Sequence, residues 1–218
     1  MAKAQRMVYQ TEETRQHILA CAEKIFTERG FFDAQMKDIA ESVGMSRHTI
    51  YRYYQDKFDL GFAILESVLL RWRDQNLSVI RPLLSDRTTD ALSRVDRLIR
   101  STIMVRQEDA QFRFVAQFDT FVSSDRAPVN FREHLEESIG LEVFVLMEEL
   151  VRQGQADGSI RTDKSARLLI LVLTESLVAL QHRLVLRGNQ IIQLESDEVE
   201  HLAEESLDML ISGLAAKQ

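Results

Sequence analysis

Apolar residues recur at three- and four-residue intervals along almost the whole chain, and no segment alternates convincingly with the two-residue period of a strand. The first apolar stripe contains Ile18, Ala22 and Phe26, which share one face of a helix. Thr11 is placed to cap the start of this helix and Gly30 to end it. The pattern therefore predicts an amphipathic helix between these two residues.

A short second stripe covers residues 36–43 and stops at Gly44. Ser46 follows as another N-cap candidate, so a third helix is expected to run from there to about Tyr54. A fourth, long helix then begins at about Lys57. Two short helices separated by a glycine turn are typical of a helix-turn-helix.

The long helix is expected to end near Pro82, because proline cannot continue the hydrogen-bond ladder. Beyond Ser85 the same spacing predicts one helix after another. These helices cover about residues 92–102, 114–122, 135–150, 163–187 and 196–214. With only 8 Gly and 2 Pro in 218 residues, the chain has too few turn residues for a sandwich or barrel. We therefore predict an all-α fold of about nine helices.

Composition is that of a soluble protein from a reducing compartment. The single Cys21 cannot form an internal disulfide or a cysteine-based zinc site, and we expect a small buried side chain rather than a redox-sensing thiol. The N-terminus lacks the apolar stretch of a secretion signal, and apolar runs such as residues 168–173 are far shorter than a membrane span. We therefore expect a cytoplasmic location and no membrane partner.

The net charge of −7 is unevenly distributed. Residues 1–60 hold 9 basic and 9 acidic residues and sum to zero, so the rest of the chain supplies the whole excess. Between Met45 and Lys57, two arginines, one lysine and one histidine are accompanied by a single acid, Asp56. Because attraction to phosphate depends on the local patch, the acidic total does not exclude a nucleic-acid partner.

The segment MKDIAESVGMSRHTIYRYY, residues 36–54, carries the strongest functional signal. Ala40 is small where one helix crosses another, Gly44 permits a tight turn, and Ile50 anchors the second helix from inside. The outward face then mixes phosphate donors with groups that hydrogen-bond base edges, which suits a helix in the major groove. The alternative is an ordinary amphipathic helix pair whose polar face is merely solvated.

Residues 11–66 resemble the N-terminal domain of the TetR family of regulators. The segment TEETRQHILACAEKIFTERG is similar to its first helix, and MKDIAESVGMSRHTIYRYYQDKFDL to its helix-turn-helix and the start of its fourth helix. The resemblance implies a DNA-binding head, residues 1–56, and a larger helical body for ligand binding and dimerisation, residues 57–218. It also implies dimerisation through the last two long helices.

The resemblance further implies which side chains contact double-stranded DNA. Lys57 would hold a phosphate, and Ser46 would cap its helix and place its hydroxyl near another. The other contacts that the resemblance implies are Lys37, Arg47, His48, Thr49, Tyr51 and Tyr53, and the outward face of the helix adds Arg52. His48 and Tyr53 depart from the residues common in the family, so the operator sequence cannot be borrowed from a relative. Tyr54 is expected in the core.

The ten N-terminal residues include Lys3, Arg6 and Tyr9 and no acid. Basic arms of this kind can reach a neighbouring DNA groove. We favour a disordered, solvated end over a DNA-contacting arm.

By the same resemblance, the C-terminal part would contain an effector pocket and the dimer interface. An apolar pocket suits the composition, because 6 of the 11 phenylalanines fall between Phe112 and Phe144, although aromatic stripes are more often core. The predicted pocket residues are Trp72, Met104, Phe118, Phe121, Phe144, Met147 and Glu175. The predicted dimer contacts are Leu177, Leu180, Leu184, Leu207, Leu210, Ile211 and Leu214.

Enzymatic motifs are absent from the sequence, which has no glycine-rich phosphate loop, no serine elbow and no pair of histidines at i, i+4 spacing. We therefore predict no catalytic residue, no cofactor and no metal site, and assign His134 and Glu137 to a solvated face. The predicted function is a homodimeric repressor of neighbouring genes that leaves a palindromic operator when a small, largely apolar effector binds. The alternative is a helical adaptor that uses its basic head to bind a protein.

Overall fold

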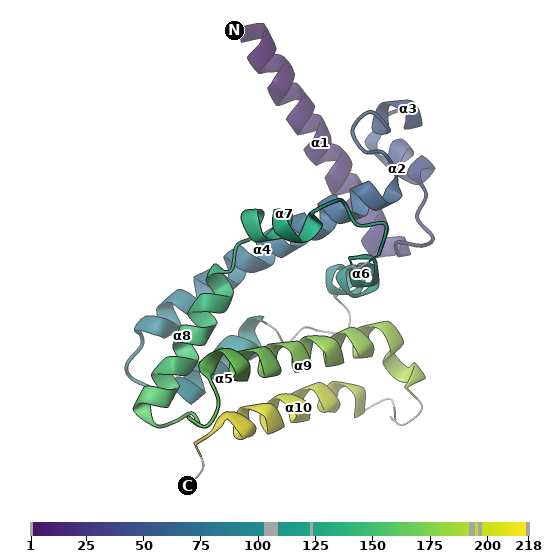
Figure 1. Ribbon diagram of the computed structural model, residues 1–218. Coiled ribbons are helices and arrows are strands. Elements are labelled where there is room, and N and C mark those ends of the chain that lie inside the picture. The colour runs from purple at the N-terminus through teal and green to yellow at the C-terminus, as the bar shows by residue number, and fades with distance from the viewer. Residues whose placement is uncertain (1, 103–108, 123, 192–194, 196–197, 217–218) are drawn as a thin grey trace. The chain divides into compact units, whose positions relative to one another are not determined.

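Helices make up nearly all of the regular structure (Figure 1). The computed structural model describes residues 2–102, 109–122, 124–191, 195 and 198–216. The helices are α1 (Ala2–Arg29), α2 (Met36–Val43), α3 (Arg47–Ile50), α4 (Lys57–Ser85), α5 (Ala91–Thr102), α6 (Ala110–Phe118), the 3-10 turn η1 (Asp119–Phe121), α7 (Phe131–Ser138), α8 (Glu142–Asp157), α9 (Ala166–Arg187), the 3-10 turn η2 (Gly188–Gln190) and α10 (Glu198–Leu214). Within those residues the only strand-like pairing is an isolated bridge between Ile160 and Ala215. The all-α prediction is confirmed.

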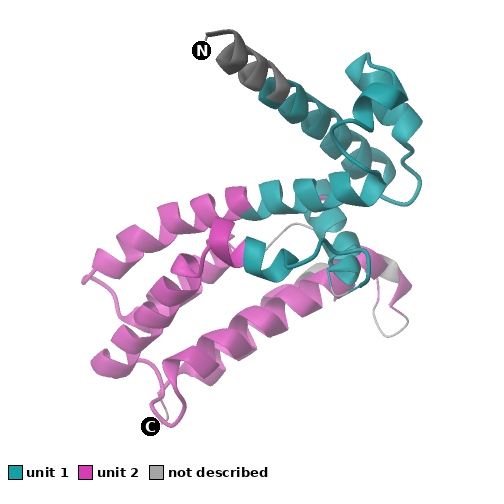
Figure 2. Ribbon diagram, turned by 45° about the horizontal axis from the view of Figure 1, so that its top comes forward, with its two compact units in different colours: residues 1–69, 110–134 teal, residues 70–109, 135–218 magenta. Residues whose placement is uncertain are grey.

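The chain divides into two compact units, which are treated separately here (Figure 2). Unit 1 contains residues 1–69 and 110–134, and unit 2 contains residues 70–109 and 135–218. Helix α4 begins in unit 1 and ends in unit 2, whereas α6 and η1 belong to unit 1 although they follow α5 in the chain. The predicted functional boundary between residues 56 and 57 stays a prediction.

Unit 1 is built around phenylalanine rings that come from α1, α4, α6, the start of α7 and the segments that follow α1 and α6. The ring centroid of Phe31 lies 5.2 Å from those of Phe26 and Phe58 and 4.9 Å from that of Phe118, all in edge-on geometry. Such pairs add about 0.5–1.5 kcal/mol each beyond the area that they bury. The remaining rings of this aromatic cluster are Phe62, Phe114, Phe121 and Phe131. The cluster fixes α6 against α1 and α4.

Unit 2 packs aliphatic side chains of α5, α8, α9 and α10 with those of the C-terminal part of α4. Each of these helices contributes at least one side chain that is completely buried: Ile80, Leu98, Leu150, Ile170 and Leu207. Burial of one leucine or isoleucine contributes roughly 1.5–3 kcal/mol. The unit therefore has an aliphatic core of its own, distinct in composition from the aromatic cluster.

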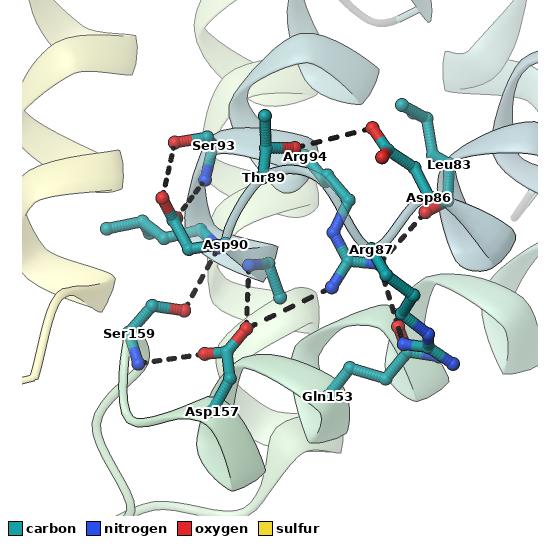
Figure 3. A network of polar contacts seen from close by, with 12 residues as sticks. Leu83, Asp86, Arg87, Thr89, Asp90, Ser93, Arg94, Gln153, Asp157 and Ser159 are labelled. Carbon is teal, nitrogen blue, oxygen red and sulfur yellow. Dashed lines mark hydrogen bonds and ion pairs between the residues drawn. The ribbon is translucent and has the colours of Figure 1, made fainter.

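Arg94 is a buried charge in unit 2 that connects three helices (Figure 3). Its Nη1 donates to the carbonyl oxygen of Leu83, near the end of α4, at 2.9 Å and to Oε1 of Gln153 in α8 at 2.8 Å. Its Nη2 lies 3.9 Å from Oδ2 of Asp157, which accepts the backbone N–H of Ala91 at the start of α5 at 2.9 Å. Since the last carbonyls of a helix lack intrahelical donors, the guanidinium supplies one at the end of α4.

The N-terminal helix is longer than expected. Helix α1 begins at Ala2, so Thr11 lies inside it and does not cap it, and the expectation of a disordered end is wrong. The preceding residues contain no glycine or proline to interrupt a helix. The side chains of Lys3, Arg6 and Tyr9 lie outside the described part of the chain, so their contact with DNA stays untested.

Two other helix boundaries also differ from the prediction. Helix α4 continues past Pro82 to Ser85, since a proline removes only its own N–H and its carbonyl still accepts the N–H of Asp86 at 3.1 Å. The helix expected over residues 135–150 is two helices, α7 and α8, separated at Gly140, whose φ of +70° is left-handed.

Candidate nucleic-acid interface

Gly44 forms the turn between α2 and α3. Its φ is +72°, a left-handed conformation that glycine adopts without steric cost, and the N–H of Met45 reaches back to the carbonyl of Ala40 at 2.9 Å. Ala40 is 3% exposed and Ile50 is completely buried, so both fill the space between the crossing helices. The predicted scaffold roles of Ala40, Gly44 and Ile50 are confirmed.

Ser46 caps α3 as predicted. Its Oγ accepts the backbone N–H of Thr49 at 3.1 Å, and the two hydroxyls form a hydrogen bond of 2.9 Å. The regular helix ends at Ile50, earlier than expected, because the N–H groups of Arg52 and Tyr53 bond to carbonyls three residues back and tighten the chain into a turn. The segment that carries most of the predicted DNA contacts is thus one helical turn followed by a tighter turn.

The predicted contact residues form an exposed face on α3 and on the turn after it. Exposed members are Ser46, Arg47, His48, Tyr51 and Arg52, while Thr49 and Tyr53 are half-buried. Tyr54 points inward and is 5% exposed, as expected from the sequence. Burial raises the pKa of Tyr54, and the cationic Arg15 beside its ring opposes that rise. The face thus offers cationic, aromatic and hydroxyl groups from one short segment.

The two arginines of this face have no charged or hydrogen-bonded partner among the residues that the structure describes. Within the described residues, neither Arg47 nor Arg52 forms an ion pair or a side-chain hydrogen bond. Lys37 on α2 lies 3.7 Å from Glu41, but both side chains are mostly exposed, and such a pair contributes little. These three cations remain available to a phosphate.

Lys57 is placed differently from the other predicted contacts. Its Nζ donates to the carbonyl oxygens of Phe31 at 2.8 Å, Phe32 at 3.1 Å and Ala34 at 3.1 Å. It also lies 4.6 Å from the ring centroid of Phe31. Burial lowers the pKa of Lys57, and the charge of Asp33 opposes this. The phosphate contact implied by family resemblance therefore competes with three carbonyl partners.

The predicted pocket residues are divided between the units. Phe118 and Phe121 belong to the aromatic cluster of unit 1, where ring packing accounts for them. Unit 2 contains Trp72 and Phe144, both half-buried, Met147 in the core, and Glu175, which is exposed. Met104 lies outside the described residues. The sequence did not reveal this division, because stripes in core and pocket helices have the same spacing.

The predicted dimer residues mostly face the interior of unit 2. Leu177, Leu184, Leu207 and Leu214 are buried, and Leu180, Leu210 and Ile211 are partly buried beside them. Among the side chains that the structure describes, the large apolar residues that α9 and α10 leave exposed are Leu168 (47%), Val172 (50%), Leu186 (41%) and Met209 (74%). None of these four is among the predicted dimer contacts, although residues 168–173 are apolar nearly all round, a pattern that predicts burial against the chain's own body and against another chain. The i, i+4 spacing of Leu168 and Val172 places the two side chains on one face of α9.

The described residues contain neither a cluster of metal ligands nor an apolar helix that is free of core contacts. No group of three or more His, Cys, Asp or Glu side chains there is placed to hold a metal ion. The Nε2 atom of His134 lies 2.9 Å from Oε1 of Glu66. Among the helices of the described segments, α9 is the one with the length and apolar composition of a membrane span, and several of its leucines are buried in the core of unit 2. A core helix passes the same test, so this is weak support for a membrane role.

The N-terminal part of the chain matches known regulators in sequence. Residues 18–64 match the profile described as bacterial regulatory proteins, tetR family. Over 109 residues the chain is 28% identical to the HTH-type transcriptional activator FasR of Mycolicibacterium smegmatis, a match that covers 50% of this chain and 48% of FasR. The chain therefore spans about half the length of this curated relative.

The fold also has solved counterparts. A TetR-family transcriptional regulator of Pectobacterium atrosepticum is similar with a TM-score of 0.67 and 22% identity, covering 96% of this chain and 97% of that one. FadR of Bacillus subtilis, solved in complex with stearoyl-CoA, is similar with a TM-score of 0.60 and 18% identity, covering 91% of this chain and 98% of FadR. At these identities the likeness shows the fold alone.

Proposed function

Because this chain belongs to the TetR family of bacterial regulatory proteins, we propose that it is a transcription regulator that binds operator DNA through α2 and α3. The observation that carries the proposal is the exposed face of α3, where Arg47 and Arg52 have no partner within the described residues. An arginine without an intramolecular partner is free to bind a phosphate or a guanine edge. The proposed role is regulatory rather than catalytic, and it places the protein with the chromosome in the cytoplasm.

The proposed regulator is a homodimer that reads a palindromic operator. Support comes from α9, where Leu168 and Val172 are about half exposed one helical turn apart, and from Met209 on the neighbouring α10. Apolar side chains gathered on adjacent helices are typical of an interface. A two-fold axis there would give each head one half-site, with centres about 34 Å apart along the DNA.

The proposed effector is small and largely apolar, and its binding lowers operator affinity. Trp72, Phe144 and Met147 of unit 2 are the residues that we assign to it, since they provide aromatic and polarisable surface. The stearoyl-CoA complex of FadR supports this chemistry, because a protein of the same fold holds an acyl chain. We propose that the regulator represses its neighbouring genes. FasR is named an activator, so a reporter assay is needed to determine whether this regulator represses or activates transcription.

A binding assay tests the DNA-binding role. Fluorescence anisotropy would compare the promoter duplex beside this protein's own gene with a scrambled duplex of equal length, over a range of salt concentrations. We expect a preference of about a thousandfold or more for the promoter duplex. Equal affinity for the two duplexes would refute sequence-specific recognition and favour the adaptor function.

Two arginine variants sharpen this assay. Arg52→Ala should weaken binding to both duplexes and make the slope of log K against log salt shallower by about 0.9, the value for one phosphate contact. Arg187→Ala, which removes an exposed arginine at the end of α9, should change neither quantity. Equal losses in the two variants would mean that general charge, and not the α3 face, attracts the DNA.

Stearoyl-CoA serves as the probe for the effector. A rise in the thermal midpoint together with release of the promoter duplex would support an acyl effector. Binding without any change in operator affinity would contradict ligand control by this class of compound.

A further inference from the structure

The ammonium group of Lys57 occupies a position that needs a physical explanation. Lys57 is the first residue of α4, where the positive end of the helix dipole disfavours a cation. The capping group of α4 is instead Asp56, whose Oδ1 accepts the N–H of Asp59 at 2.9 Å. Lys57 therefore does not contribute to the cap, and its three carbonyl contacts must offset an unfavourable location.

The three carbonyls belong to the connection between α1 and α2. Gly30, with a φ of +83°, turns the chain out of α1, and the residues after it precede the regular hydrogen bonding of α2. Phe31 and Ala34 are each only 1% exposed, whereas Phe32 between them is 65% exposed, so the bonds to Phe31 and Ala34 are partly shielded from water and the bond to Phe32 is not. Shielded carbonyls without a donor are costly, and Lys57 supplies a donor to the carbonyls of Phe31 and Ala34 as well as to the exposed carbonyl of Phe32.

The bonding capacity of the ammonium group is fully used by these contacts. An ammonium group has three N–H bonds, and each points to one carbonyl oxygen at 2.8–3.1 Å. A phosphate contact would require one of these bonds to be given up. Arg47 and Arg52, by contrast, have no such commitment within the described residues.

The position of the contacts along the chain gives them a wider effect. The bond from Lys57 to Ala34 closes a loop, residues 35–56, that contains both α2 and α3. We propose that Lys57 is a positioning residue, which tethers the α1–α2 connection to the start of α4 and so fixes the helix-turn-helix within unit 1. Its contribution to DNA affinity is then geometric, whereas the phosphate charge is neutralised by Lys37, Arg47 and Arg52. This second part rests on the proposed DNA-binding function.

The tether is tested first on the free protein by amide hydrogen exchange. Lys57→Met keeps the apolar stem and removes all three donors, while Lys57→Arg keeps the charge but replaces three converging N–H bonds with a planar fork. In both variants exchange of the α2 amides should accelerate on the order of tenfold or more, with α9 amides unchanged as the internal reference. The matched control Lys37→Met, on the exposed face of α2, should leave exchange as in the wild type. Wild-type exchange of α2 in Lys57→Met would overturn the tether.

The salt dependence of promoter binding tests the second part. Lys57→Met should bind more weakly at every salt concentration while keeping the wild-type slope, whereas Lys37→Met should give a slope shallower by about 0.9. A shallower slope for Lys57→Met with unchanged exchange would assign Lys57 to a phosphate. Full affinity in Lys57→Arg would do the same, since a guanidinium can replace an ammonium group at a phosphate but not among three converging carbonyls.

The two parts of the test can fail separately. If the wild type shows no preference for the promoter duplex, the proposed function fails, and the exchange experiment still decides the tether. If Lys57→Met unfolds unit 1, the milder Lys57→Gln, which keeps two N–H donors, replaces it in both assays. Lys57→Gln should then lie between the wild type and Lys57→Met in exchange rate, and wild-type behaviour would count against the tether.

Discussion

Gly61→Ala should destabilise unit 1, although alanine is the better helix former. Gly61 lies in α4 against the aromatic cluster, and a Cβ at this position would lie 2.4 Å from Cε2 and 2.5 Å from Cζ of Phe118. It would also lie 3.2 Å from the ring of Phe31. Ordinary carbon contacts are about 3.5–4.0 Å, so a ring must move.

The surrounding rings leave Phe118 little room to move. Phe118 is completely buried, and its centroid lies 4.8 Å from Phe62, 4.9 Å from Phe31 and 5.4 Å from Phe114. Overpacking of a core costs about 1–3 kcal/mol, and a clash of this depth belongs to the upper half of that range. The better helix propensity of alanine returns about 1 kcal/mol. We therefore expect a net loss of about 1–2 kcal/mol.

Urea denaturation followed by circular dichroism measures the loss, and amide exchange assigns it to unit 1. Gly213→Ala in α10 is the matched control, because a Cβ there meets nothing within 4 Å, and it should stabilise by about 0.5–1 kcal/mol. Phe118→Leu removes the ring atoms in the clash. It should therefore lower the free energy of unfolding less in the Gly61→Ala variant than in the wild-type protein. If Gly61→Ala stabilises the protein as Gly213→Ala does, the tight packing of Phe118 on α4 is refuted.

Three further predictions concern unit 2. Arg94→Met should lower the free energy of unfolding by about 1–3 kcal/mol, because it leaves the carbonyl of Leu83 without its donor. Urea denaturation followed by the fluorescence of the single tryptophan measures this loss, and wild-type stability would contradict the prediction. Burial would raise the pKa of the Asp157 carboxyl, but hydrogen bonds from Ser159 help to hold this pKa below its ordinary value of 3.8. The stabilisation that the ionised carboxylate gives the fold is therefore complete above the pKa of the unfolded chain, and it is lost as the pH falls through the lower pKa of the folded protein. Stability should therefore decline below about pH 4, and less so in Asp157→Asn; equal acid profiles would exclude this cause. Leu168→Glu should increase the monomer fraction in sedimentation without loss of helix content, and an unchanged dimer would remove α9 from the interface.

The sequence predicted the helix-turn-helix well because its signals are local. Gly44 ends one helix, Ser46 begins the next, and Ala40 and Ile50 are close to both in the chain. Each of these residues determines the backbone or packing within a few positions of itself. Once the buried residues of this short segment are assigned, the remaining side chains form the exposed face on α3 and on the turn after it.

The assignment of partners to apolar faces could not be predicted in the same way. Leu177 and Leu207 were expected at a dimer interface, yet they lie in the core of unit 2, while Leu168 and Val172 are exposed. Periodicity identifies an apolar face of a helix but not the surface that covers it. For the same reason Phe118 could be called pocket or core, since only the fold brings α6 against α1 and α4 in unit 1.

The carbonyl contacts of Lys57 and the close packing at Gly61 are coupled through the ring of Phe31. They are four residues apart on α4 and therefore lie on the same face of the helix. Phe31 contacts both, since its ring lies 4.6 Å from the Nζ of Lys57 and is 3.2 Å from the Cβ that Gly61→Ala would add. A ring displaced by that methyl group also disturbs the turn that Lys57 tethers. The destabilisation caused by Lys57→Met and Gly61→Ala should thus be non-additive by about 0.5 kcal/mol or more in a double-mutant cycle. Strict additivity would mean that Phe31 transmits no strain between the aromatic cluster and the helix-turn-helix.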